Sequence, residues 1–128
     1  MDAKAQIEAA LADLQTSGGE HSFVIFIGDA DRGYYIQFAG ARGEDGLHAE
    51  AVGNKWLDAA SALDAEQLSR LDALGWFEPD EDCPNHYRRW TASTPADRQA
   101  IAREVVRTFA DVYGVPPDAP LEVTLNLE

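Results

Sequence analysis

Apolar side chains recur every three or four residues near the start of the chain, at Ile7, Leu11 and Leu14. This is the spacing of one face of an α-helix, and it predicts an amphipathic helix over residues 3–15. The glycine pair Gly18 and Gly19 follows and is a typical helix stop. The chain therefore is expected to open with a helix that packs one apolar stripe onto the rest of the fold.

Two further helices are indicated by start signals as well as by periodicity. Asp64 and Gln67 have the spacing of a capping box, and the helix that follows is expected to end at Gly75. Thr94 and Pro95 form an N-cap with proline in the first turn. The apolar stripe of this third helix comprises Ile101, Val105, Phe109 and Val112.

Between these helices the period changes from helical to alternating, which predicts strands. Turn-forming residues 29–33 separate the first two strands and predict a hairpin. Residues 77–93 contain two prolines and are expected to be irregular. The predicted strands are residues 22–28, 34–39, 47–52 and 121–127. The resulting order, αβββααβ, predicts a single α+β domain over residues 1–128, an antiparallel meander plus a C-terminal strand with helices on one face.

The first strand is apolar on both of its faces. Phe23 and Ile25 belong to one face, and Val24 and Phe26 to the other. A strand of this kind is covered on both sides. If the helices cover one side, a second copy of the chain, a neighbouring domain or a bound peptide covers the other. The alternative is that the first helix and residues 77–93 cover it from within the chain, and the sequence leaves both open.

Charge and cysteine content restrict the partners. The chain has 23 acidic and 10 basic side chains, a net charge of −13, which opposes binding to nucleic acid or to an anionic membrane. The single cysteine, Cys83, excludes an internal disulfide and favours a reducing compartment. No apolar segment of signal-peptide type begins the chain, so a cytoplasmic location is expected.

No catalytic or metal-binding constellation stands out. Two residues separate Cys83 from His86, but no second ligand pair matches them, and neighbouring acidic residues disfavour a reactive thiolate. No metal, cofactor or enzymatic activity is therefore expected. The acidic residues 78–82 are interpreted as a solvated loop. Tyr87 and Trp90 lie in the irregular stretch and are candidates to line a groove.

Three segments together resemble a known family. They are residues 34–39 (YYIQFA), residues 50–57 (EAVGNKWL), and residues 71–76 (LDALGW) followed by Pro79 and Asn85. They resemble the TY-Chap domains, bacterial relatives of type III secretion chaperones and of YbjN-type proteins, over about residues 5–127. Gly53 departs from the serine expected before Asn54. The resemblance implies a peptide-binding α+β domain without catalytic residues, in a family whose secretion relatives commonly act as dimers.

The leading hypothesis is a non-enzymatic, chaperone-like protein that binds a peptide segment of a partner protein, with a homodimer as a further expectation. The sheet face away from the helices is expected to supply the contacts, with edge pairing adding backbone hydrogen bonds. The candidate residues are Val24, Phe26, Tyr35 and Gln37, together with Tyr87 and Trp90. The alternative is an acidic immunity-like or antitoxin-like inhibitor that masks a basic protein by charge complementarity.

Overall fold

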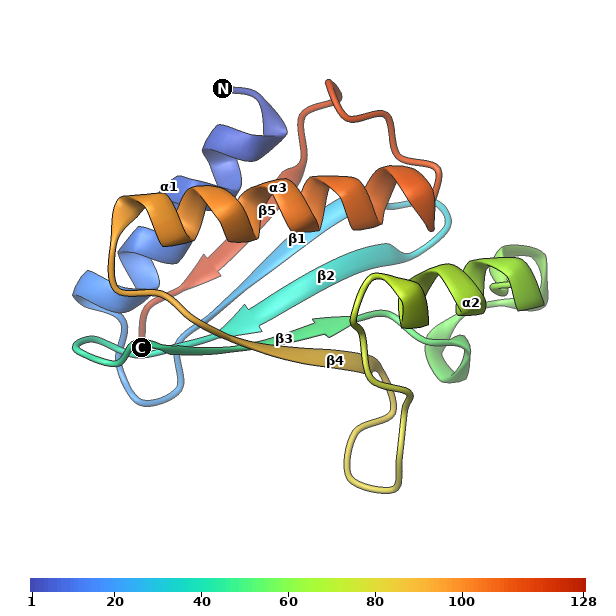
Figure 1. Cartoon of the computed structure of the whole chain (residues 1–128), viewed down its shortest axis with the longest axis horizontal. Helices are drawn as coiled ribbons and strands as arrows, with labels where there is room; N and C mark the ends of the chain where they lie inside the picture. Colours follow the sequence, from blue (N-terminus) through green and yellow to red (C-terminus); the bar gives the residue numbers. More distant parts are fainter.

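The computed structural model describes residues 1–128 as one antiparallel five-stranded sheet with helices on one side (Figure 1). The strand order across the sheet is β4-β3-β2-β1-β5, so the first three strands form the predicted meander and the last strand pairs with the first. The strands are β1 (Phe23–Asp29), β2 (Tyr34–Ala39), β3 (Gly46–Ala51), β4 (His86–Thr91) and β5 (Glu122–Asn126). The α+β architecture is as the sequence predicts, with one additional strand.

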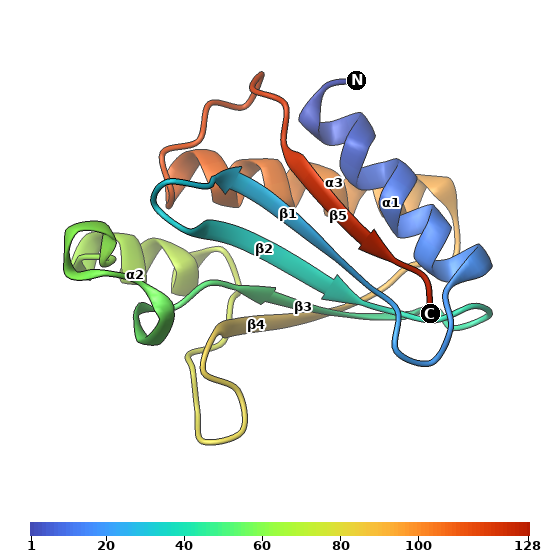
Figure 2. The ribbon, with the colours of Figure 1, turned by 180° about the vertical axis from the view of Figure 1, so that it is seen from behind.

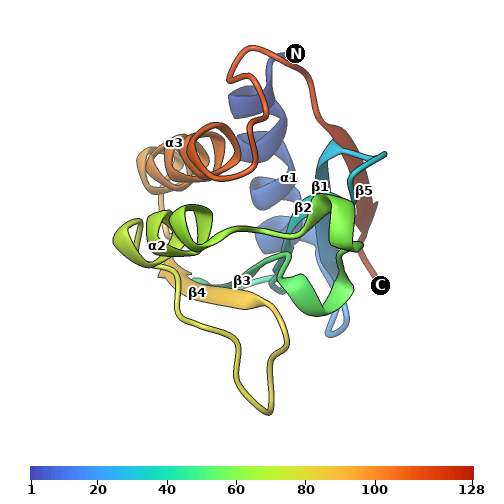
Figure 3. The ribbon, with the colours of Figure 1, turned by 90° about the vertical axis from the view of Figure 1, so that its right-hand side faces the viewer.

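Three α-helices lie on the same side of the sheet, as the side view in Figure 3 shows. They are α1 (Ala3–Ser17), α2 (Ala65–Ala73) and α3 (Pro95–Asp111), with two short 3-10 turns at Asn54–Trp56 and Ala59–Ser61. Seen from behind, the strands of the sheet face the viewer and no helix covers them (Figure 2). None of the helices combines the length and the apolar character that a membrane span requires.

The predicted helix boundaries are confirmed by their caps. Asp64 and Gln67 hydrogen-bond to each other's backbone in a full capping box, and Thr94 and Asp97 do the same at the start of α3. Gly75 follows α2 with φ +93°, a left-handed conformation that a residue with a side chain rarely adopts. Each box satisfies backbone N–H groups that the first helical turn leaves without a partner.

A bulge at Gly28 sets the register of the β1–β2 hairpin. Asp29 pairs with Tyr34, but the next pair is Ile27 with Tyr35, so Gly28 is the extra residue. A Cβ atom at Gly28 would lie 2.7 Å from Val115 Cγ2 and 2.9 Å from Phe109 Cε1, so only glycine fits there without displacing them. The bulge shifts every later pair in the hairpin by one residue.

The shift corrects the expected placement of Val24 and Phe26. Without the bulge, Phe26 would pair with Gln37 and share its face; with it, Phe26 pairs with Ile36 and Val24 with Phe38. Both side chains are fully buried beneath the helices. The prediction that they lie on the face away from the helices is therefore wrong, and Phe23, Ile25 and Ile27 occupy that face.

Strand β4 was not anticipated, because residues 77–93 were expected to be irregular. His86, Arg88 and Trp90 point to the helix side, as their pairing with the buried Ala51, Ala49 and Leu47 shows. The Trp90 ring stacks on Phe38 at 5.7 Å between centroids, and the Arg88 guanidinium lies 4.2 Å above it. Arg88 hides the alternation in the sequence, because an arginine can bury its stem while its charged end reaches a partner, here the Leu74 carbonyl oxygen.

The opposite edge of the sheet, β5, is more exposed than its alternating pattern predicts. Val123 and Leu125 pair with Phe26 and Val24 on the helix side, yet they stay 39% and 37% exposed. The helix layer therefore ends before the last strand. The outer edge of β5 pairs with no other strand.

The fold predicts different costs for shortening the two sides of β1. Phe26→Ala removes a fully buried ring and is expected to lower the free energy of unfolding by about 3–5 kcal/mol. Ile25→Ala on the uncovered side is expected to cost about 1 kcal/mol, because part of that side chain stays in water. Urea unfolding followed by circular dichroism measures both, and equal losses would show that both faces are covered.

His86 predicts a loss of stability in mild acid. Burial lowers the pKa of His86 below 6.5, and the opposing charge of Glu78 offsets this only in part. As pH falls through about 6.5 the unfolded chain binds a proton that the folded chain does not, so the free energy of unfolding decreases. We expect a smaller decrease between pH 7 and pH 5 in His86→Gln than in the wild type. His21→Gln, an exposed histidine, is the matched control and should behave as the wild type.

Candidate functional site: the open face of the sheet

The uncovered face of the sheet carries an apolar row flanked by polar side chains. Phe23, Ile25 and Ile27 form the row on β1, and each is partly buried. We call this surface the open face. Its residues are Phe23, Ile25, Ile27, Tyr35, Gln37, Ala39, His48, Glu50, Tyr87 and Arg89. No helix covers this side of the sheet (Figure 2).

A hollow of about 300 Å³ lies on the open face, where the start of β1 and the end of β2 lie beside β3. Ala39 is exposed at its centre, between Phe23 on β1 and His48 on β3. The methyl side chain of Ala39 is shorter than those of both neighbours, which leaves the depression. Ile25, Gln37 and Glu50 complete the wall in the adjacent row. The hollow therefore has an apolar side on β1 and a polar side on β3.

Aromatic rings continue the open face toward β4. Phe77 forms an isolated bridge with Tyr87, and their ring centroids are 5.3 Å apart. Tyr87 in turn stacks beside His48 at 6.3 Å. Phe77 is 61% exposed, which is unusual for a ring of this size. The aromatic edge and the β1 row thus flank the hollow on either side.

Buried Asn85 links the open face to the loop that precedes β4. Its Nδ2 donates to the Tyr35 hydroxyl and to Glu50 Oε1, each at 3.2 Å, and its Oδ1 accepts from the Gly53 N–H at 3.0 Å. A Cβ atom at Gly53 would lie 3.0 Å from the Pro84 carbonyl oxygen. Glycine at this position therefore allows the loop to approach β3 closely.

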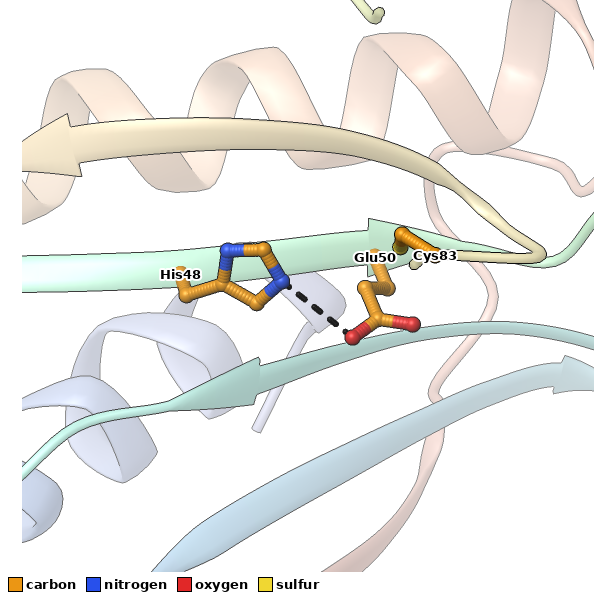
Figure 4. Close-up of side chains that lie close together, drawn as sticks. All are labelled: His48, Glu50 and Cys83. Atoms are coloured by element: carbon orange, nitrogen blue, oxygen red, sulfur yellow. Dashed lines mark hydrogen bonds and ion pairs between the residues drawn. The ribbon is translucent and has the colours of Figure 1, made fainter. Parts of the chain in front are cut away.

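The same loop brings Cys83 to His48 and Glu50 (Figure 4). His48 Nε2 lies 3.2 Å from Glu50 Oε2, and the nearest ligand-type atoms of the three residues are all within 4.8 Å of one another. The Cys83 thiol donates to the Asn85 carbonyl oxygen at 3.4 Å. Sequence spacing suggested His86 as the neighbour of Cys83, but His86 points to the helix side of the sheet.

The electrostatic surroundings of Cys83 oppose its use as a nucleophile. Burial raises the pKa of the thiol, and the charge of Glu50 raises it further, although the contact with the Asn85 backbone acts in the other direction. A catalytic cysteine needs the opposite shift, toward the thiolate. The triad of cysteine, histidine and carboxylate here has the carboxylate beside the thiol and is not arranged for acyl transfer.

Asp80 organises the acidic loop that was interpreted as solvated. Its Oδ1 accepts from the N–H groups of Asp82 and Cys83 at 2.9 Å, and its Oδ2 accepts from the Tyr87 hydroxyl at 3.1 Å. The backbone bond from Cys83 is the main cause of a lowered pKa at Asp80. One carboxylate therefore fixes the loop, while the others face solvent.

Of the six residues proposed from sequence, three lie on the open face: Tyr35, Gln37 and Tyr87. Val24 and Phe26 are buried, and Trp90 packs on the helix side against Phe38 and Trp76. The β1 row, Ala39 and the cluster around Cys83 were not assigned to the site. The register of the β1–β2 hairpin is the signal that could have assigned Phe23, Ile25 and Ile27 to the open face. That register depends on the bulge at Gly28, which the sequence pattern does not reveal.

The chain was compared with known protein families, curated proteins and solved structures. No curated protein and no solved structure shows significant similarity to the chain. The family described as "T3SS (YopN, CesT) and YbjN peptide-binding chaperone 3" matches residues 3–125, from the start of α1 to the penultimate residue of β5. The chain belongs to this TY-Chap3 family of peptide-binding chaperones.

Proposed function

We propose that the protein is a non-enzymatic chaperone that holds an extended segment of a partner protein on the open face of its sheet. The observation that carries this is the uncovered apolar row of β1, which lies beside the hollow at Ala39. The family supplies the class of ligand, a peptide. The uncovered apolar surface is what supports this location for it.

Apolar burial is the main source of binding energy in this proposal. Phe23, Ile25 and Ile27 follow one another at every second residue, so they repeat at the spacing of alternate side chains in an extended peptide. Covering such a row contributes roughly 25 cal/mol for each Å² of apolar surface removed from water. An apolar side chain of the client would enter the hollow over Ala39, beside Phe23.

Charge indicates which segments would bind. The chain has a net charge of −13, and Glu50 and Glu122 lie on the open side of β3 and β5. A client segment with basic residues between its apolar ones would be attracted, and an acidic segment would be repelled. The proposed client is therefore an extended, apolar and basic stretch of polypeptide held in the cytoplasm.

Filling the hollow is expected to abolish peptide binding without unfolding the protein. A phage-displayed library of short random peptides first selects binders, and fluorescence anisotropy then measures the affinity of a selected peptide. Ala39→Trp places a ring in the hollow, and Ile25→Lys puts a charge in the apolar row. We expect each to weaken binding at least about tenfold, equivalent to about 1.4 kcal/mol.

Ala9→Trp is the matched control, because Ala9 is an exposed alanine on α1, away from the open face. It should bind as the wild type does. Unchanged affinity in Ala39→Trp and Ile25→Lys would refute the proposed surface. Loss of binding in Leu125→Lys alone would place the peptide at the edge of β5 instead. A wild-type dimer that Ile25→Lys converts to a monomer, seen by light scattering, would assign the face to self-association.

A further inference from the structure

His48, Glu50 and Cys83 offer three different metal-binding atoms at one point of the fold. The nearest imidazole nitrogen, carboxylate oxygen and sulfur lie within 4.8 Å of one another. Ligands of one tetrahedral zinc ion stand about 3.4–3.8 Å apart, for bond lengths of about 2.1–2.3 Å. Small side-chain rotations would therefore bring all three to a common centre. Figure 4 shows Glu50 between His48, on the same strand, and Cys83, on the loop.

Backbone geometry, and not chance proximity of flexible chains, brings the ligands together. His48 and Glu50 are two residues apart on β3 and so point to the same side of the sheet. Cys83 is held by the turn at Asp80, whose Oδ1 accepts from the Cys83 N–H at 2.9 Å. Pro84, the residue after Cys83, is also held in place, because its carbonyl oxygen lies close to Gly53.

Glu50 is also oriented by a hydrogen bond from outside the cluster. Asn85, itself buried, donates to Oε1 of Glu50 at 3.2 Å, which leaves Oε2 directed at His48. Such outer hydrogen bonds are characteristic of protein metal sites, where they hold the ligand in its binding orientation. Asn85 thus holds Oε1 of Glu50, and Oε2, on the side of His48, is the oxygen that an ion would bind.

The donor set selects the kind of ion. Sulfur and imidazole favour zinc and related first-row transition ions, whereas magnesium and calcium take oxygen ligands. A thiolate and a carboxylate together neutralise the two charges of the ion, so the bound site would carry no net charge. The side chains of His48 and Glu50 are 33% and 22% exposed, which leaves a fourth position open to water.

We infer that His48, Glu50 and Cys83 form a three-ligand site for a zinc-like divalent transition ion on the open face. Binding would convert the Cys83 thiol to a thiolate and release its proton to solvent. This inference does not rest on the proposed function, although His48 and Glu50 also form the polar wall of the hollow beside the β1 row.

Cobalt(II) is the probe, because a cobalt–thiolate bond gives a charge-transfer absorption and tetrahedral cobalt gives intense visible bands. Untagged, reduced protein is titrated with Co²⁺, and Zn²⁺ is then added to displace it. We expect one equivalent of Co²⁺ to produce both sets of bands, Zn²⁺ to remove them, and Zn²⁺ alone to raise the melting temperature.

Variants at the cluster decide whether these three residues hold the ion. Cys83→Ser should lose the charge-transfer band, and His48→Gln and Glu50→Gln should each weaken Co²⁺ binding at least tenfold. His21→Gln, an exposed histidine elsewhere, should bind as the wild type does, and circular dichroism confirms that each variant is folded. Absence of the bands in the wild type, or equal affinity in His48→Gln and Glu50→Gln, would overturn the inference.

Discussion

The bulge at Gly28 decides which side of β1 the helices cover, and the rest of the structure depends on it. One additional residue in the hairpin pairs Phe26 with Ile36 and Val24 with Phe38, so these four side chains form the centre of the core. Only glycine fits at the bulge, because Phe109 of α3 and Val115 after it occupy the space that a side chain at position 28 would need. The packing of α3 on the sheet therefore depends on the same glycine that sets the register of the β1–β2 hairpin. Moving the register by one residue would exchange the buried and the uncovered rows.

Coverage on one side only gives the two faces of the sheet different roles. The helix side is closed by aromatic packing that extends to Trp90 and Trp76 at the β4 edge. On the other side, an apolar row on β1 and a polar cluster on β3 lie side by side, separated by the short side chain of Ala39. The first suits an extended apolar chain and the second suits an ion. The hollow at Ala39 adjoins both, because its walls include Phe23 and Ile25 on β1 and His48 and Glu50 on β3.

Local signals predicted the helices and the first hairpin strands well. Capping residues such as Asp64 and Thr94 act within one helical turn, so their effect can be read from neighbouring positions. Strand β4 escaped because Arg88, on its helix side, reads as a polar position although its guanidinium donates to the Leu74 carbonyl oxygen, a partner distant in sequence. The grouping of Cys83 with His48 was equally hidden, since it depends on how closely the loop approaches Gly53. Contacts that depend on tertiary packing produce no periodic pattern in the sequence.

The unpaired edge of β5 has a consequence for how copies of this protein meet. An exposed edge strand beside apolar side chains, here Val123 and Leu125, is a template for sheet extension between molecules. Glu122 and Glu128 stand near the two ends of this edge, and the whole chain repels its copies through its net charge of −13. The sequence pI is about 4.4, so acidification toward that value removes the repulsion while leaving the edge intact. The net negative charge of this chain thus opposes aggregation through edge-to-edge pairing of β5.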